Sequence, residues 1–228
     1  MVEIVGIKLL NTELFLSAKE KLFTLLPIAV VEKLTNFKHS ANMQRSLWGE
    51  ILLRKYLSDK INLKSDQIIF ETNDKGKPFL KNNPIHFNIT HSGDWVLAAF
   101  SDDVVGIDVE LIHKVNYDIA TRFFSIKECN DLFNIKDDEA RKSYFFDLWT
   151  LKESYLKAIG TGLTKPLNTF TISFNENNIT LRDEEHPLQN VFFRQYFLEE
   201  NYKVSVCSFS NFFSDNLKIL SLEDILYI

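Results

Sequence analysis

The sequence predicts an α+β protein built from two similar α/β lobes that are related by pseudo-two-fold symmetry. Segments with the apolar spacing of helices alternate with short strand-like runs along the chain. Each half contains a helix that carries a tryptophan, Trp48 or Trp149, followed by strands. Each half also contains a strand that ends in a Phe-Ser run, VLAAFS at 96–101 and VSVCSFS at 204–210. This repeated order suggests an ancient duplication.

The first predicted lobe comprises residues 1–104. Its first segment alternates apolar and polar residues, as a half-buried strand does. Pro27 is suited to open a helix, and Ser40 to cap the next one. The expected elements are a strand at 2–9, helices at 13–25, 27–37 and 41–60, strands at 67–72, 85–90 and 95–101, and turns at 73–76 and 92–94.

The second predicted lobe comprises residues 105–228, and no low-complexity linker separates it from the first. We therefore expect the two lobes to pack tightly against each other. The expected elements are a strand at 105–110, helices at 117–124, 126–134 and 138–160, and strands at 169–174, 178–182, 190–197, 203–209 and 217–222.

Composition places the chain among soluble globular proteins. Of its 228 residues, 45% are hydrophobic and 25% charged, and its 20 Phe can fill a sizeable core. No signal peptide or membrane-length apolar run is present, so we expect a cytoplasmic protein without membrane contact. The net charge of −5 argues against nucleic-acid binding. Two cysteines fit a reducing compartment or form one bridge, and they have no metal-ligand spacing.

The central strand, residues 105–110, carries two acids on one face. On a strand Asp108 and Glu110 project to one side, while Ile107 and Val109 project to a buried side. We expect the acids to be exposed. Because two neighbouring carboxylates repel each other unless a cation lies between them, the pair is either half of a metal site or an ordinary solvated strand face.

The helix that contains Trp149 presents a second set of polar residues. Helical spacing places Glu153 and Lys157 on one stripe with Trp149 and Gly160. An acid and a lysine four residues apart commonly form an exposed ion pair, yet the aromatic and apolar residues on this stripe favour a partly buried one. Gly160 is most simply the stop of this helix.

Two loops before the central strand are suited to phosphate. The Gly76-Lys-Pro78 turn exposes backbone amides and directs Lys77, although such a motif on its own is more often an ordinary loop. His91, at a strand end, either donates to a phosphoryl oxygen or caps its turn, while His86 is structural. Hard oxygen ligands with basic residues nearby match Mg²⁺-assisted phosphoryl transfer, and the lack of a Cys/His cluster argues against zinc.

Four motifs together resemble a known family. GKP (76–78), FNITHS (87–92), GIDVE (106–110) and WTLKESYLKAIGTG (149–162) are similar, in order and spacing, to the 4'-phosphopantetheinyl transferases of the larger, two-lobed Sfp type. The likeness is clearest from about Arg45 to Leu167. It implies the two-lobed fold of that family and transfer of the 4'-phosphopantetheine group of coenzyme A to a serine of an apo acyl or peptidyl carrier protein, releasing 3',5'-ADP.

The resemblance also implies roles for individual residues. Asp108, Glu110 and Glu153 would bind Mg²⁺, with Mn²⁺ as a possible substitute. Lys157 would contact the phosphate under attack, and Lys152, His91 and Thr90 would assist. The remaining coenzyme A contacts would come from Lys33, Arg45, Ser46, Lys77 and Pro78. Relatives often have a basic residue where this chain has Val30, so Lys38 or His39 replaces it or the 3'-phosphate is held more loosely.

The base that deprotonates the carrier serine stays open between two candidates. Glu128 occupies a position that the resemblance marks as catalytic, but it is also the third helical residue of a capping box that begins at Ser125. The alternative is a metal-bound water relayed by Glu153.

The expected partners are coenzyme A and a carrier protein. The carrier would dock on residues 110–124 and on the start of the next helix, where Arg122 and Lys127 meet an acidic surface. Because one chain would supply both lobes, we expect a monomer. Two other functions are weighed: a non-catalytic module that binds coenzyme A or a carrier, and an unrelated Mg²⁺-dependent nucleotide phosphoryl-transfer enzyme, which a missing Walker loop disfavours.

Overall fold

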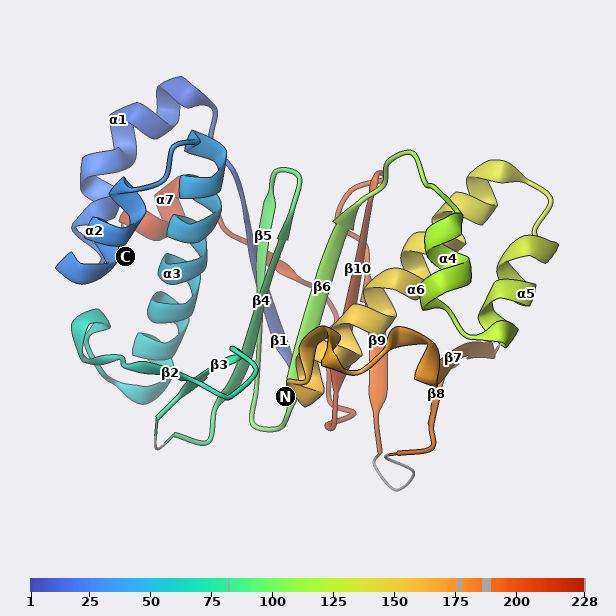
Figure 1. Ribbon diagram of the computed structural model, residues 1–228. Helices are drawn as coiled ribbons and strands as arrows, with labels where there is room; N and C mark the ends of the chain where they lie inside the picture. The colour runs from blue at the N-terminus through green and yellow to red at the C-terminus, as the bar shows by residue number, and fades with distance from the viewer. Residues whose placement is uncertain (82, 176–177, 186–189, 228) are drawn as a thin grey trace.

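The computed structural model describes residues 1–81, 83–175, 178–185 and 190–227. Two lobes lie side by side, each with helices on the outside and a sheet on the inside (Figure 1). The molecule therefore has four layers in the order helices, sheet, sheet, helices, which confirms the mixed α/β fold with two lobes. No described helix is long and apolar enough to span a membrane.

The first lobe is built mainly from the N-terminal half. Its helices and strands are β1 (Glu3–Lys8), α1 (Thr12–Phe23), α2 (Ile28–Thr35), α3 (Ser40–Ile61), β2 (Phe70–Thr72), β3 (Pro78–Leu80), β4 (His86–Ser92) and β5 (Trp95–Ser101), with a 3₁₀ turn at Ser65–Gln67. The strand β3 was not predicted. Ser40 is not the N-cap of α3, because His39 occupies that position without a side-chain cap.

The second lobe follows without a break. Its elements are β6 (Val105–Leu111), α4 (Asp118–Phe123), α5 (Ile126–Asn134), α6 (Asp138–Ile159), β7 (Phe170–Asn175), β8 (Asn178–Asp183), β9 (Phe192–Tyr196) and β10 (Tyr202–Ser208), with 3₁₀ turns at Gly162–Thr164 and Leu167–Thr169. The long helices α3 and α6, with 22 residues each, occupy corresponding places in the two lobes (Figure 1).

The last elements of the chain return to the first lobe. The short strand β11 (Lys218–Ile219) pairs in parallel with β1, and the helix α7 (Leu222–Leu226) packs beside α3 (Figure 1). The predicted strand at 217–222 is therefore only two residues long, and a helix that was not predicted follows it. Consequently the second lobe is not the continuous stretch 105–228, because Ile225 is buried in the core of the first lobe.

Three apolar cores connect the four layers. One lies between α1–α3 and the sheet β11-β1-β5-β4, and another between α4–α6 and the sheet β6-β10-β9. The third joins the two sheets, because alternate residues of β5 and β6, such as Leu97 and Ile107, meet there and are fully buried. This confirms that the Ile107 and Val109 side of the central strand is buried, and burial of this apolar surface stabilises the contact between the lobes.

The facing strands β4 and β6 are joined by side chains rather than by a backbone ladder. The backbone amides of Ile107, Val109 and Leu111 donate to the side-chain oxygens of Asn88, Thr90 and Ser92, at 2.9, 3.4 and 3.1 Å. Alternate residues of a strand share one face, so the donors on β6 and the acceptors on β4, each spaced two residues apart, lie opposite one another. These bonds hold β6 in register with β4 at the junction of the lobes.

Candidate functional site

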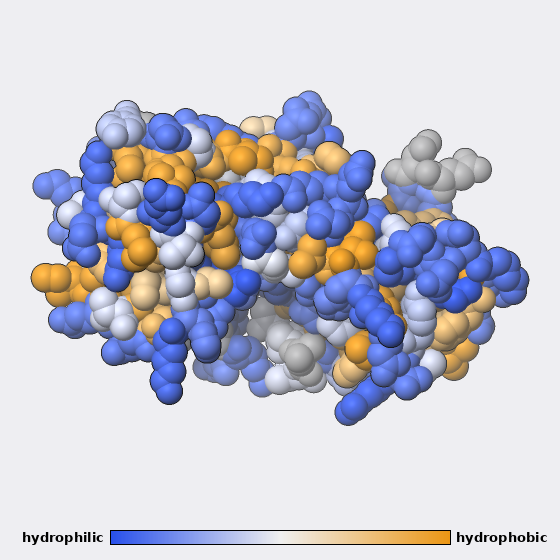
Figure 2. Space-filling model, turned by 90° about the horizontal axis from the view of Figure 1, so that it is seen from above, coloured by the Kyte–Doolittle hydropathy of each residue, from blue (hydrophilic) through white to orange (hydrophobic). Residues whose placement is uncertain are grey.

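A cleft of about 910 Å³ lies between the lobes, and we refer to it as the interlobe cleft. The view from above shows a recess between the two lobes at the lower edge of the picture (Figure 2). The polar residues that line the interlobe cleft are Lys33, Arg45, Ser46, Glu50, Thr72, Thr90, His91, Asp108, Glu110, Glu153 and Lys157. Most of the predicted site residues, from both lobes, therefore share one space.

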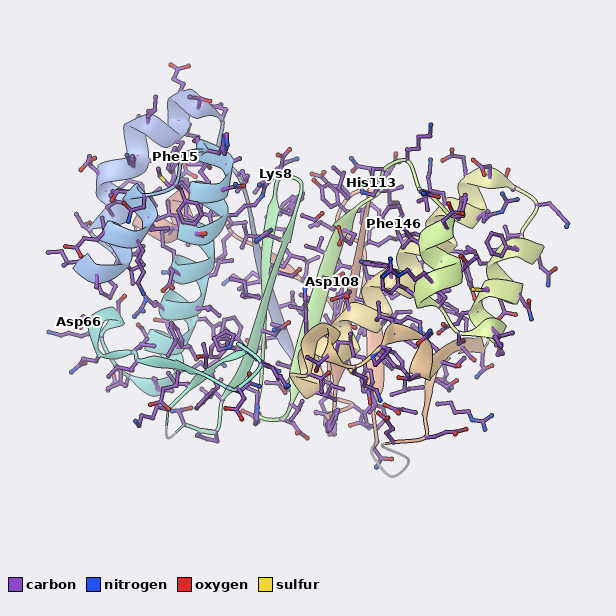
Figure 3. All side chains as sticks on the ribbon, in the orientation of Figure 1. Lys8, Phe15, Asp66, Asp108, His113 and Phe146 are labelled. Carbon is purple, nitrogen blue, oxygen red and sulfur yellow. The ribbon has the colours of Figure 1, made fainter. Side chains whose placement is uncertain are left out.

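Three carboxylates meet at the second-lobe side of the interlobe cleft. Asp108 and Glu110 come from β6 and Glu153 from α6, and Figure 3 places Asp108 at the centre of the molecule. Gly106 permits this meeting, because a Cβ there would lie 2.1 Å from the Ser154 carbonyl oxygen of α6. With no side chain at Gly106, the backbone of α6 approaches β6 directly and brings Glu153 alongside the strand acids.

All three acids have a raised pKa because they are buried in the cleft. Burial, followed by repulsion from Asp108, raises the pKa of both Glu110 and Glu153. Burial also raises the pKa of Asp108, and the nearby Lys157 ammonium opposes this shift. Clustered acids with raised pKa values are typical of sites that hold a cation or exchange protons.

Asp108 is buried, contrary to the expectation from the sequence that it is exposed. Only 4% of its surface is accessible, because α6 covers it. Its Oδ1 accepts hydrogen bonds from Lys157 Nζ at 2.6 Å and from Thr90 Oγ1 at 3.3 Å. Its Oδ2 is buried without a hydrogen-bond partner among the described residues. A buried carboxylate oxygen without a donor is costly, unless a cation binds it.

The chemistry of these donors fits Mg²⁺. All three are carboxylates, they face one cleft, and Oδ2 of Asp108 is available. Within the described part of the chain, however, no three acidic, histidine or cysteine side chains are already close enough together to hold an ion. Small side-chain rotations, including release of Asp108 from Lys157, would therefore accompany metal binding.

Basic and polar side chains occupy the first-lobe side of the cleft. Arg45 donates from Nε and Nη2 to the Gly93 carbonyl oxygen, at 3.2 and 2.8 Å, which ties α3 to the turn after β4. Partial burial, followed by the charge of Arg45, lowers the pKa of His91. Lys33 on α2 is exposed at the cleft, and Ser46 and Pro78 also line it.

An apolar wall, which the sequence analysis did not identify, extends the cleft into the first lobe. It is formed by Val30, Leu34, Phe37, Gly49, Leu53, Phe70, Pro78 and Ile89. Apart from Phe37, which follows α2, these residues come from α2, α3, β2, β3 and β4. Helical spacing on α2 and α3 was visible in the sequence, but which side chains face the cleft depends on how these helices pack.

Lys77 does not reach the interlobe cleft, and its predicted contact with the nucleotide has no support here. Its ammonium donates to the carbonyl oxygens of Val105 and Ala158, at 3.2 and 2.8 Å. Lys77 therefore caps the C-terminal end of α6, where the helix dipole favours a positive charge. The same loop donates from Asn73 Nδ2 to the Gly160 carbonyl oxygen, so it links the two lobes. Gly160 ends α6 in a left-handed conformation, as predicted.

We expect replacement of Lys77 by methionine to change the pH dependence of stability. Burial lowers the pKa of Lys77 from its usual 10.5 to about 8. Between these values the folded state binds fewer protons than the unfolded state, so unfolding free energy rises with pH. The advantage of wild type over Lys77→Met should grow by on the order of 3 kcal/mol from pH 7 to 10.5, measured by urea denaturation.

The control for this experiment is Lys75→Met, on the exposed part of the same turn. This variant should follow wild type at every pH. Burial raises the pKa of the Cys207 thiol and lowers that of His86, but both groups are present in wild type and in Lys77→Met, so their effects on stability cancel in the difference. A constant difference between wild type and Lys77→Met across the range would contradict a lowered Lys77 pKa.

Glu128 and Lys152 are also outside the cleft, where they form a buried ion pair. Both side chains are fully buried, and Lys152 Nζ lies 2.8 Å from Glu128 Oε1. Glu128 also accepts from the amides of Ser125 and Ile172, each at 2.7 Å, which confirms the predicted capping box. Lys152 further donates to two backbone carbonyl oxygens. With every contact directed into the protein, neither residue is placed to touch a phosphate or a serine.

Two protein-family models and several known proteins match this chain. The model of the 4'-phosphopantetheinyl transferase superfamily matches residues 104–207, and the model of the N-terminal 4'-phosphopantetheinyl transferase domain matches residues 18–102. The chain is 36% identical over 199 residues to the 4'-phosphopantetheinyl transferase Sfp of Bacillus subtilis (strain 168), covering 86% of this chain and 87% of that protein.

One further relative and one solved structure were also found. The chain is 42% identical over 179 residues to the 4'-phosphopantetheinyl transferase gsp of Aneurinibacillus migulanus, covering 78% of this chain and 74% of that protein. Among solved structures, the Thermotoga maritima holo-[acyl-carrier-protein] synthase aligns at a TM-score of 0.39 with 20% identity, covering 46% of this chain and 61% of that one.

Proposed function

Because the chain belongs to the 4'-phosphopantetheinyl transferase family, we propose that its interlobe cleft binds coenzyme A and carries the residues of the transfer reaction. The enzyme transfers the 4'-phosphopantetheine group from coenzyme A to a carrier protein. The observation that best supports this site is the meeting of three acids, Lys157 and His91 in one cleft with an apolar wall. Such a cleft suits a ligand that has both phosphates and an apolar ring.

Coenzyme A would lie across the cleft, with its charged and ring portions in different places. The apolar wall of the first lobe favours the adenine ring, and Lys33 and Arg45, which line the same part of the cleft, would pair with the 3'-phosphate. His91 and Lys157 would hold the pyrophosphate, because both line the polar part of the cleft beside Asp108. Lys77, Lys152 and Glu128 lie outside the cleft, where their contacts would stabilise the surrounding structure without touching the ligand.

The transfer itself is a displacement at phosphorus. The serine oxygen of the carrier forms a bond to the phosphorus that bears pantetheine, and the bond from that phosphorus to the bridging oxygen breaks to release 3',5'-ADP. Lys157, once freed from Asp108, neutralises negative charge on the attacked phosphate. Glu153 would accept the serine proton, directly or through water, because its carboxylate lines the cleft beside Lys157.

Asp108, Glu110 and Glu153 are the residues that would hold Mg²⁺. The ion would supply charge neutralisation at the pyrophosphate of coenzyme A. Without it, three carboxylates would repel that pyrophosphate. This electrostatic conflict is the reason to assign a cation to the cleft, with Mn²⁺ as a substitute.

The carrier would dock on α4 and the start of α5. Arg122 and Lys127 are the basic residues there, but Lys127 is already paired with Asp131 at 2.6 Å. Ile126, which is 83% exposed, adds an apolar contact beside them. That the enzyme acts as a monomer in the cytoplasm stays a prediction.

The test incubates the protein with coenzyme A, Mg²⁺ and an apo carrier protein, followed by mass spectrometry of the carrier. We expect a mass gain of one phosphopantetheine group, and we expect EDTA to prevent it. Acyl and peptidyl carriers should be compared, because the family alone does not choose between them. Binding of coenzyme A without any mass gain, over several carriers, would instead favour a non-catalytic binding module.

A further inference from the structure

Three side chains of β4 form what we call the side-chain ladder to β6, and two of them also contact the acids that would bind the metal. Asn88, Thr90 and Ser92 all accept a backbone hydrogen bond from β6, but only the last two also donate to a carboxylate. Thr90 donates to Asp108, and Ser92 Oγ donates to Glu110 Oε2 at 2.8 Å. The Ser92 hydroxyl accepts a hydrogen bond from the Leu111 amide, so its single proton is free to be donated to Glu110.

The two strand acids share one pattern of hydrogen bonds. In Asp108, Oδ1 is held by Thr90 and Lys157, while Oδ2 has no partner among the described residues. In Glu110, the hydrogen bonds of the described residues reach only Oε2, which Ser92 holds. Each carboxylate thus has one oxygen fixed by a hydroxyl of β4 and the other left for a cation. Ligating carboxylates in metal sites are commonly fixed in this way by a second hydrogen bond.

The segment that carries Ser92 is held from both lobes. Arg45 of α3 donates twice to the Gly93 carbonyl oxygen. From the other side, the Tyr202 hydroxyl of β10 accepts the amide hydrogen of Asp94 at 3.0 Å. Gly93 has a φ of +54° and is packed against Tyr202, so the turn has little freedom to move. A hydroxyl on such a fixed turn can hold a carboxylate in one orientation.

We propose that Ser92 is a positioning residue for Glu110, orienting its carboxylate for the divalent cation across the junction of the two lobes. The inference rests on the proposed metal site and adds to it a residue of the first lobe. It also assigns the lobe junction a part in metal binding: β4 of one lobe orients the ligands that β6 of the other provides. Ser92 does not touch the substrate.

The test measures Mn²⁺ binding directly, by the loss of the free-ion electron paramagnetic resonance signal on titration with protein and coenzyme A. Ser92→Ala should raise the dissociation constant about tenfold. Ser92→Thr keeps the hydroxyl and should remain within about twofold of wild type. In turnover assays, Ser92→Ala should need correspondingly more Mg²⁺ for half-maximal rate, with kcat restored at saturating Mg²⁺ and the KM for coenzyme A unchanged.

Asn88→Ala is the matched control, because Asn88 makes the same ladder bond but touches no carboxylate. It should lower the melting temperature and leave the Mn²⁺ dissociation constant unchanged. Unchanged Mn²⁺ affinity in Ser92→Ala, or equal weakening in Ser92→Ala and Asn88→Ala, would overturn the role of Ser92. If Asp108→Asn also binds Mn²⁺ normally, the metal site itself is wrong; if only Asp108→Asn loses binding, the metal site stands and Ser92 is structural.

Discussion

Asp108→Asn is expected to lower the rate of phosphopantetheine transfer by about two orders of magnitude or more. A cation in such a site contributes several kcal/mol of charge stabilisation, and each 1.4 kcal/mol is a tenfold change in rate. Asparagine keeps the size of Asp108 and an oxygen that accepts from Lys157 and Thr90, so the packing is preserved. The rate is measured from the mass of the carrier, and the fold from the melting temperature.

Asparagine is chosen over alanine because Asp108 is buried. Alanine would leave the Lys157 ammonium beside an empty space, with Thr90 as its one acceptor among the described residues, so a loss of activity would be confused with a loss of stability. The matched control is Asp103→Asn, on the turn that precedes the same strand and outside the interlobe cleft. Transfer at the wild-type rate in Asp108→Asn would remove this residue from the site.

Glu128→Gln is expected to destabilise the protein by about 3–5 kcal/mol without slowing the chemistry of the folded molecules. The substitution leaves Lys152 buried and charged, with its carboxylate partner lost. The glutamine side chain also brings an NH₂ group, which cannot accept, to a place where the backbone amides of Ser125 and Ile172 and the Lys152 ammonium all donate. Urea denaturation measures the stability, and kcat is corrected for the folded fraction.

Two further variants sharpen this experiment. Asp131→Asn breaks the exposed pair with Lys127 on the same helix and should cost less than about 1 kcal/mol. The double variant Glu128→Gln/Lys152→Met should be more stable than Glu128→Gln alone, because the unpaired charge is removed. A Glu128→Gln protein that keeps its stability but loses kcat would return Glu128 to a catalytic role.

Most of the fold was predictable because its elements have strong local signals. The regular apolar spacing around Trp48 and Trp149 marks the long helices α3 and α6, and both occur within one or two residues of the expected bounds. The order in which helices and strands follow one another was also visible in the sequence. The elements that were missed, β3 and α7, have three and five residues, and β11, which was predicted too long, has two; such segments are too short for a period to emerge.

For the site, too, the sequence indicated which residue types matter but not where each side chain lies. The motifs marked Asp108, Glu110, Glu153, Lys157 and His91, and the structure brings all of them into one cleft. The motifs also marked Lys77 and Lys152, and the family resemblance marked Glu128, but these three side chains point elsewhere. A lysine that binds phosphate and a lysine that caps a helix look alike in sequence, because both need only a long cationic side chain.

The sequence by itself determined the two-lobed order of elements, the family and the residues with acidic or basic chemistry, because these depend on local spacing and residue type. Only the tertiary structure decided which of them face the cleft. The close approach of α6 to Gly106 buries Asp108 against Lys157, and the ladder from β4 brings Ser92 to Glu110. These contacts join residues from different elements, so no period or motif along the chain contains them.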